Sequence, residues 1–323
     1  MNIICIGAYD QQSYYVSARG NNINDGLSEA SSLKSLSFAV RRAIENGIYT
    51  VTVIGTLDKL SEQPNISTAS VFSLLTRSNR ELLITGKKNA AGPDRAVLSA
   101  LGSNRSVLGV ANSLSLRIEN IEISGGENVS DEIRTGAGII IRQGATVTLG
   151  VGAIVKNNEN YGAMFDGKLI IDGGEISNHY GEFAVFIQEN GVLTMHNGLI
   201  KNNYTTKFNI MIAPGGSFVM HGGSISNNKI PHAGGGVYIF ENGNFIMSGG
   251  SINNNNAGDR YGGGGVFVMN DGIFTITGGS INNNTAAAGG GVYVSNNGRF
   301  YLTGGTISHN IATRGSDHNI LRE

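Results

Sequence analysis

The chain has 323 residues, a formal net charge of −1 and 15% charged residues, so it lacks the basic face of a nucleic-acid-binding domain. Its 48 Gly and 4 Pro do not fit collagen, and 40% hydrophobic residues are enough to build a core. No apolar run approaches the length that spans a membrane, so we expect no transmembrane segment.

The segment 1–48 is predicted to form an N-terminal cap. Apolar residues recur at helical spacing from Leu33 to Ile44 and are followed by Gly47, which predicts an amphipathic helix over 33–46. A helix of this kind covers the open end of a solenoid and shields its first coil from water. The short apolar run near the start has no Lys or Arg before it, so we recognise no signal peptide.

From residue 49 to residue 310 a short motif returns along the chain. Its best copies begin with Gly-Gly-Ser-Ile or Gly-Gly-Thr-Ile, end with Asn, and occupy 222–228, 249–255, 278–284 and 304–310. Each copy closes a set of three short alternating strands, as at 237–239, 245–247 and 251–253. The period varies around roughly 25 residues, which suits a β-solenoid, because its strands must stack while its turns can grow.

Two parts of the sequence resemble known proteins. Tyr-Tyr-Val-Ser at 14–17, Asn-Asp-Gly at 24–26, the helix and Thr-Val-Thr-Val at 50–53 look like the N-terminal cap of bacterial pectate-lyase-like right-handed parallel β-helix proteins. The repeats resemble those of bacterial cell-surface β-helix proteins, including chlamydial polymorphic outer-membrane proteins. The resemblance implies a fold and no single activity, because lyases, hydrolases, adhesins and phage tail proteins share it.

The predicted fold is therefore all-β. We expect a single-stranded right-handed parallel β-helix with three strands per coil and about ten coils over 49–310, behind the cap. The remaining residues, 311–323, are predicted to form a C-terminal tail.

A ladder of amides is predicted in the turn after the third strand. One position of successive copies is held by Asn203, Asn228, Asn255, Asn284 and Asn310. Stacked identical amides hydrogen-bond along such a column, so we expect a structural role. The alternative is direct contact between these amides and sugar hydroxyls.

One group of polar residues is a candidate for chemistry. Aligning the second strands places Asp172, His196 and His221 in one outward column, with Glu175 near its foot. Neighbours would lie ~4.8 Å apart, so the two His could share a metal ion, or Asp172 could orient His196. The alternative is a polar surface column without chemistry. We expect no cofactor, since the clustered carboxylates that hold Ca²⁺ in pectate-lyase-like enzymes are not evident.

The middle residues of the first strands are predicted to point outward, and they are apolar. The predicted stripe consists of Ile140, Phe165, Phe186, Met211, Tyr238, Phe267 and Tyr293. Exposed apolar surface marks a contact, and aromatic rows suit sugar rings or a flat protein partner. The stripe could instead pair with a second copy of the chain, or be covered by inserted loops such as 255–263.

These patterns favour a non-catalytic, extracellular or bacterial cell-surface protein that binds a polysaccharide or a protein through the stripe. One alternative is a polysaccharide lyase or glycoside hydrolase of the pectate-lyase-like fold. Another is a structural subunit of a fibre, a sheath or a phage tail. No pattern indicates nucleic acid as a partner.

Overall fold

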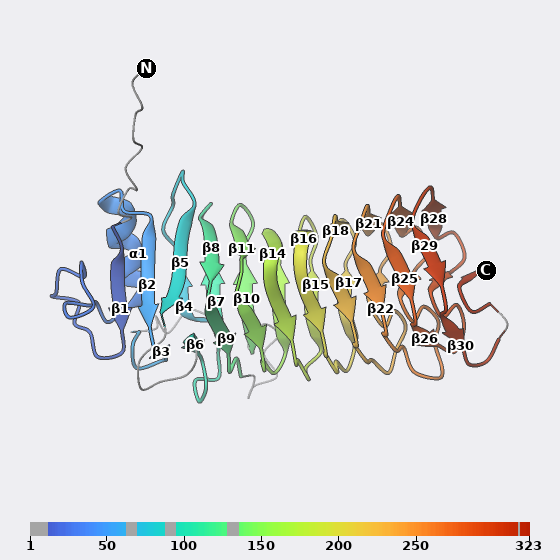
Figure 1. Cartoon of the computed structure of the whole chain (residues 1–323), viewed down its shortest axis with the longest axis horizontal. Coiled ribbons are helices and arrows are strands. Elements are labelled where there is room, and N and C mark those ends of the chain that lie inside the picture. Colours follow the sequence, from blue (N-terminus) through green and yellow to red (C-terminus); the bar gives the residue numbers. More distant parts are fainter. Residues whose placement is uncertain (1–11, 63–69, 88–94, 128–135, 316) are drawn as a thin grey trace, which may run out of the picture.

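A computed structural model describes residues 12–62, 70–87, 95–127, 136–315 and 317–323. Within these residues every strand pairing is parallel, and the strands stack along one long axis from the N-terminal to the C-terminal end (Figure 1). The predicted all-β, solenoid-like architecture with long parallel sheets is thus confirmed.

The first strands of the repeats form a ten-stranded sheet, which we call the first-strand sheet. Its members are β4 (Ser70–Leu74), β7 (Ser106–Val110), β10 (Ala137–Ile141), β13 (Tyr161–Phe165), β15 (Phe183–Ile187), β17 (Phe208–Ile212), β20 (Val237–Ile239), β23 (Val266–Val268), β27 (Val292–Val294) and β31 (Ile320–Arg322).

The second and third strands join in a 19-stranded sheet, and β26 (Thr285–Ala286) pairs separately with β30 (Ile311–Ala312). The large sheet contains β1 (Tyr14–Ser17), β2 (Thr50–Ile54), β3 (Thr56–Leu57), β5 (Leu82–Lys87), β6 (Ala96–Ser99), β8 (Ser115–Glu119), β9 (Ile121–Ser124), β11 (Thr146–Leu149), β12 (Ile154–Lys156), β14 (Lys168–Ser177), β16 (Val192–Lys201), β18 (Ser217–Met220), β19 (Ser224–Ser226), β21 (Asn244–Met247), β22 (Ser251–Asn253), β24 (Ile273–Ile276), β25 (Ser280–Asn282), β28 (Arg299–Leu302) and β29 (Thr306–Ser308).

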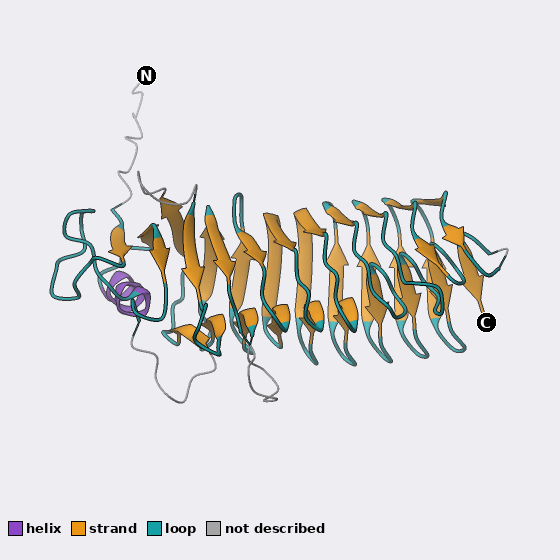
Figure 2. Ribbon diagram, turned by 90° about the horizontal axis from the view of Figure 1, so that it is seen from below, coloured by secondary structure: helices purple, strands orange, loops and turns teal. Residues whose placement is uncertain are grey.

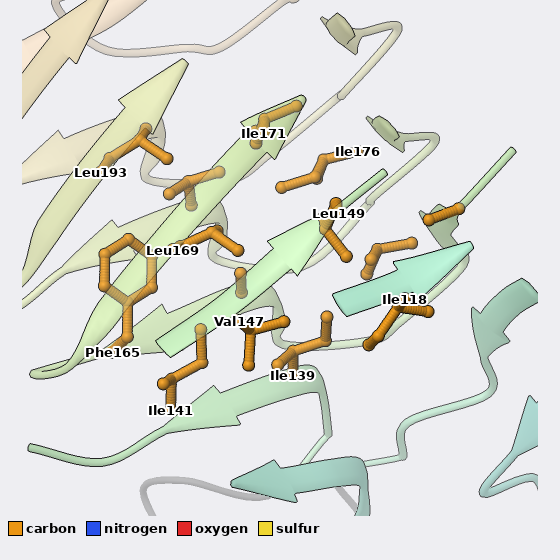
Figure 3. Packing of buried hydrophobic residues seen from close by; sticks show 14 of the residues in the cluster. Ile118, Ile139, Ile141, Val147, Leu149, Phe165, Leu169, Ile171, Ile176 and Leu193 are labelled. Atoms are coloured by element: carbon orange, nitrogen blue, oxygen red, sulfur yellow. The ribbon is translucent and has the colours of Figure 1, made fainter. Parts of the chain in front are cut away.

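The core lies between the sheets, because alternate side chains of each strand point inward. Figure 3 shows Ile139, Val147 and Leu169 from three neighbouring strands meeting there. The register stacks like on like: Phe218, Phe245, Phe274 and Phe300 occupy one column, with ring centroids 4.5, 4.8 and 5.2 Å apart. Burial of each such side chain contributes ~1.5–3 kcal/mol, and only neighbouring coils can supply it.

The N-terminal end is closed by α1 (Leu36–Glu45), which lies beside β1 and β2 (Figure 2). The Ser35 hydroxyl caps this helix by accepting the Phe38 N–H, and Leu36, Val40 and two alanines of the helix are buried in the core. The observed helix is shorter than the predicted range 33–46, since Leu33 bridges to β1 as extended chain. Among the described residues, no helix is long and apolar enough to cross a membrane.

The C-terminal end is more open. Leu302 continues an inward column of the core and yet is 46% exposed, because β28 is the last strand on its side of the sheet. Strand β31, within the segment predicted as a tail, adds a last strand to the first-strand sheet by pairing with β27.

Candidate functional site

The turn after the third strand contains the predicted amide ladder, which is confirmed. The Asn203 Nδ2 donates to the Asn228 Oδ1 at 2.9 Å, and the same bond recurs at 2.8–3.0 Å up to Asn310. Each acceptor oxygen also takes the backbone N–H of the preceding ladder residue, at 2.9–3.1 Å. The amides are buried and their hydrogen-bonding groups are used within the turn, so they are not available to a ligand.

The ladder continues past the predicted amides at both ends. Asn319, from the C-terminal segment, accepts from Asn310 at 3.1 Å. At the other end, buried Asn158 and His179 hold the equivalent positions. The His179 Nδ1 lies 3.4 Å from the Asn158 N, and its Nε2 lies 3.2 Å from the Val155 O.

Several glycines in or directly before the first strands lie close to the ladder. A Cβ on Gly162 would lie 2.6 Å from the His179 Nε2, and one on Gly138 would lie 2.7 Å from the Asn158 Nδ2. The same close approach recurs at Gly291, 2.8 Å from the Asn310 Nδ2. A side chain at these three glycines would displace the ladder residue beside it, whereas the equivalent positions of β15 and β17 are Ala184 and Asn209.

The polar column predicted for catalysis is only partly assembled. The rings of His196 and His221 stack with centroids 5.3 Å apart and planes 9° apart, and the His221 Nδ1 lies 2.9 Å from the Ser248 Oγ. A bulge in the pairing of β14 with β16 shifts the strand register, so Asp172 pairs with Asn197 of β16 and not with His196. Parallel stacked rings do not direct their nitrogens toward a common ion.

The carboxylates near this column form salt bridges with basic side chains of the same chain. Asp172 accepts from the Arg117 Nη1 at 3.2 Å, and Glu119 accepts from the Arg117 Nε at 2.7 Å. Glu175 pairs with the Lys201 Nζ at 3.0 Å. In the part of the chain that the structure describes, no group of three or more His, Cys, Asp or Glu is arranged to hold a metal ion.

The predicted stripe exists as one column on the outer side of the first-strand sheet, with one correction. The register aligns Met164, and not Phe165, with Ile140 and Phe186, while Phe165 is buried in the inner core. Sequence alignment misplaced it by one residue, and a shift of one residue reverses the face of a strand. We call this set the outer column: Ile140, Met164, Phe186, Met211, Tyr238, Phe267 and Tyr293.

The outer column is less exposed than predicted. Ile140, Met164 and Tyr238 are buried, whereas Phe186, Met211, Phe267 and Tyr293 are half-buried. Part of the cover comes from a flanking column at the start of the same strands, which consists of Ala137, Tyr161, Phe183 and Phe208.

Loops give the remaining cover toward the C-terminal end. The backbone of Gly262 lies against the Tyr293 ring, since a Cβ there would collide with a ring carbon. The alternative that inserted loops cover the stripe therefore holds for part of its length.

Burial, and secondarily Glu241, raises the pKa of Tyr238 to about 12, so this hydroxyl stays protonated.

Three strongly exposed tyrosines lie in the loops that lead into the first strands. Tyr180, Tyr204 and Tyr261 are 65%, 49% and 45% exposed, and partly exposed His232 lies between the last two along the chain. We call these four residues the aromatic rim. Sequence reasoning missed the rim, although Tyr180 and Tyr204 directly follow the ladder residues His179 and Asn203.

The rim consists of two pairs of rings, one of which contacts the flanking column. Tyr180 and Tyr204 stack with centroids 5.8 Å apart and planes 8° apart, whereas His232 and Tyr261 lie 5.6 Å apart at 54°. His232 also lies 6.3 Å from Phe208.

Hydrogen-bonding groups lie at the flanking column and precede the rim residue Tyr261 in the chain. The Lys207 Nζ pairs with the Glu182 Oε1 at 2.7 Å, and it sits 5.8 Å from the centre of the Phe183 ring. Asp259 and Arg260 are exposed and precede Tyr261 directly. The rim and its neighbours thus combine apolar ring surface with donors and acceptors.

Comparisons with protein-family models, with curated proteins and with solved structures find no match for this chain. The site is therefore interpreted from its geometry.

Proposed function

We propose that this chain is a non-catalytic, extracellular or cell-surface β-helix protein that binds a glycan along the aromatic rim. We further propose that its coil is right-handed and of the pectate-lyase-like type. A first-strand sheet of ten strands supports a count of about ten coils, because each coil contributes one first strand.

The observation that carries the proposal is the exposure of three tyrosines along one border of the first-strand sheet. Large aromatic side chains are favoured inside a protein, so a row of exposed ones on loops is typical of a contact surface. Tyrosine suits a sugar because its ring packs against the apolar face of a pyranose while its hydroxyl bonds to the sugar's hydroxyls. His232 adds a polar group beside the Tyr261 ring, and the Lys207–Glu182 pair lies at the neighbouring flanking column.

The rim supports glycan binding better than the outer column does. Phe267 stacks on both Tyr238 and Tyr293 with planes within 8° of parallel, so its two faces are covered by its neighbours. A sugar ring needs a free aromatic face. In the rim, Tyr180 and Tyr204 stack and cover one face of each other, whereas the inclined rings of His232 and Tyr261 do not cover each other in this way.

The test compares the variant Tyr180→Ser/Tyr204→Ser/Tyr261→Ser with the control Tyr301→Ser on a panel of soluble and insoluble polysaccharides. Tyr301 is 51% exposed but lies on β28 of the other sheet. We expect the rim variant to bind its glycan at least about tenfold more weakly, which is a loss of about 1.4 kcal/mol, and the control to bind normally. Equal binding by both variants, or no glycan bound by the unaltered chain, would refute the proposal.

One observation favours a second candidate function, polysaccharide cleavage. Arg117 lies between the carboxylates of Glu119 and Asp172 on the outer side of the 19-stranded sheet. Both carboxylates raise the pKa of Arg117, so its guanidinium stays charged and would neutralise the carboxylate of an acidic sugar during cleavage. The appearance of new reducing ends or unsaturated products, lost in Arg117→Ala, would support it.

Assembly through the outer column or into a fibre is tested by the mass of the protein in solution. A monodisperse monomer at high concentration would count against both.

A further inference from the structure

One ladder position differs chemically from the others. His179 is fully buried, and both its ring nitrogens lie near backbone atoms, as the amide atoms of a ladder Asn do. The Val155 O can only accept, so Nε2 carries the proton. The Asn158 N–H can only donate, so in this form the unprotonated Nδ1 accepts the Asn158 N–H. The neutral His179 ring, with its proton on Nε2, thus takes the place of an amide in the ladder.

A second proton would have to bind at Nδ1. The ring would then be a buried cation whose Nδ1 has only long contacts, 3.4 Å to both the N and the O of Asn158. No carboxylate is among the groups that influence its titration. A buried charge without a counter-charge is costly, so the protonated ring is stabilised by leaving its site.

We propose that His179 is an acid-sensitive break in the ladder, which opens its turn on protonation and loosens the aromatic rim. Release of a ligand by this opening rests on the proposed function of the rim. The opening itself does not depend on that function.

The backbone around His179 couples the ladder to the rim. Its carbonyl accepts the Tyr204 N–H at 2.8 Å, and Tyr180 is the next residue in the chain. The turn is closely packed, since a Cβ on Gly181 would collide with the Glu159 carbonyl. Displacement of His179 therefore moves both stacked tyrosines of the rim.

The pH range follows from the burial of the ring. Burial lowers the pKa of His179 from 6.5 to about 4, outweighing the Asn158 and Val155 carbonyl oxygens, which accept from the protonated ring and raise the pKa. The closed turn holds the neutral ring, whereas an open turn holds a ring that titrates normally. The closed form is thus fully favoured above pH 6.5, and opening is promoted as the pH falls toward 4.

Other titratable groups near His179 are those of the neighbouring coils. Lys156 pairs with Glu122, Lys201 with Glu175, and Lys207 with Glu182. Glu159, Tyr161 and Tyr180 lie on adjacent loops and strands. All of them remain in the variant His179→Asn, so any pH effect of their own remains there too.

The experiment measures amide hydrogen exchange of residues 158–183, as protection factors, between pH 7 and pH 4. In the unaltered chain we expect protection to fall with a slope approaching tenfold per pH unit below 6.5, and by about 150-fold in total at pH 4. His179→Asn places an amide at the position, so its protection should stay constant over this range. The controls His196→Asn and His221→Asn alter exposed histidines and should behave like the unaltered chain.

A constant protection factor in the unaltered chain, or an equal loss in His179→Asn, would overturn the proposal. If His179→Asn does not fold, the titration of the six His C2–H signals of the unaltered chain decides. One of them must stay unprotonated at pH 5, and normal titration of all six would overturn the proposal. If exchange follows the prediction while no glycan binds at any pH, the break stands and the proposed function fails.

Discussion

Two stacks of aromatic rings run along this solenoid and differ mainly in their surroundings. Phe218, Phe245 and Phe274 stack inside the coil and are fully buried. Phe267 and Tyr293 stack outside it with nearly the same spacing, 4.9 Å, and are half-buried. Ring stacking is therefore a consequence of repeated coils and does not by itself mark a binding site. Exposure of several rings next to one another, as at the aromatic rim, is the better indicator.

The inner stack should show the largest effect on stability. Phe245→Ala removes a ring packed between two others and leaves a cavity, so we expect a loss of about 3–5 kcal/mol in the free energy of unfolding. Urea unfolding followed by circular dichroism measures it. A loss below about 1 kcal/mol would mean that the coils repack freely.

The ladder should come next. Asn255→Ala leaves the Asn228 N–H and Nδ2 and the Ile225 carbonyl without their partner inside the turn, and we expect a loss of about 3 kcal/mol in the free energy of unfolding. The matched control is Asn254→Gly, at an exposed neighbour with φ of 55° that glycine adopts readily. Similar losses in both variants would show that the turn, and not the ladder, is stabilising.

The outer stack should contribute less than the inner one. Phe267→Ala removes a ring that is half-buried, so we expect a loss of about 1–2 kcal/mol in the free energy of unfolding and no loss of glycan binding. A loss as large as that of Phe245→Ala would make the outer column a second core. A loss of glycan binding would move the site from the rim to this column.

The rim should show the smallest effect on stability. Tyr204→Ser alters a side chain that is 49% exposed, and we expect a change within about 0.5 kcal/mol in the free energy of unfolding together with weaker glycan binding. Thermal unfolding and a binding titration on the same sample separate the two effects. A large loss of stability would assign Tyr204 a structural role.

Much of the fold could be predicted from the sequence because each coil repeats the same local pattern. The Gly-Gly-Ser-Ile motif and the recurring amides determined the parallel stacking, the inward positions such as Phe245 and Phe274, and the ladder from Asn203 to Asn310. These features depend on strand alternation and on like residues meeting one coil apart, which a single chain displays directly.

Only the tertiary structure decided which side chains are exposed and which polar groups meet. Phe165 changed sides because a shift of one residue in a degenerate copy reverses the face of the strand. A bulge after Ile171 separated Asp172 from His196 and brought it to Arg117, two coils earlier. Tyr238 is buried by neighbouring columns and loops, while Tyr180 and Tyr204 stand out from turns whose course depends on the whole stack. Burial is set by every neighbouring coil at once, and no local pattern records it.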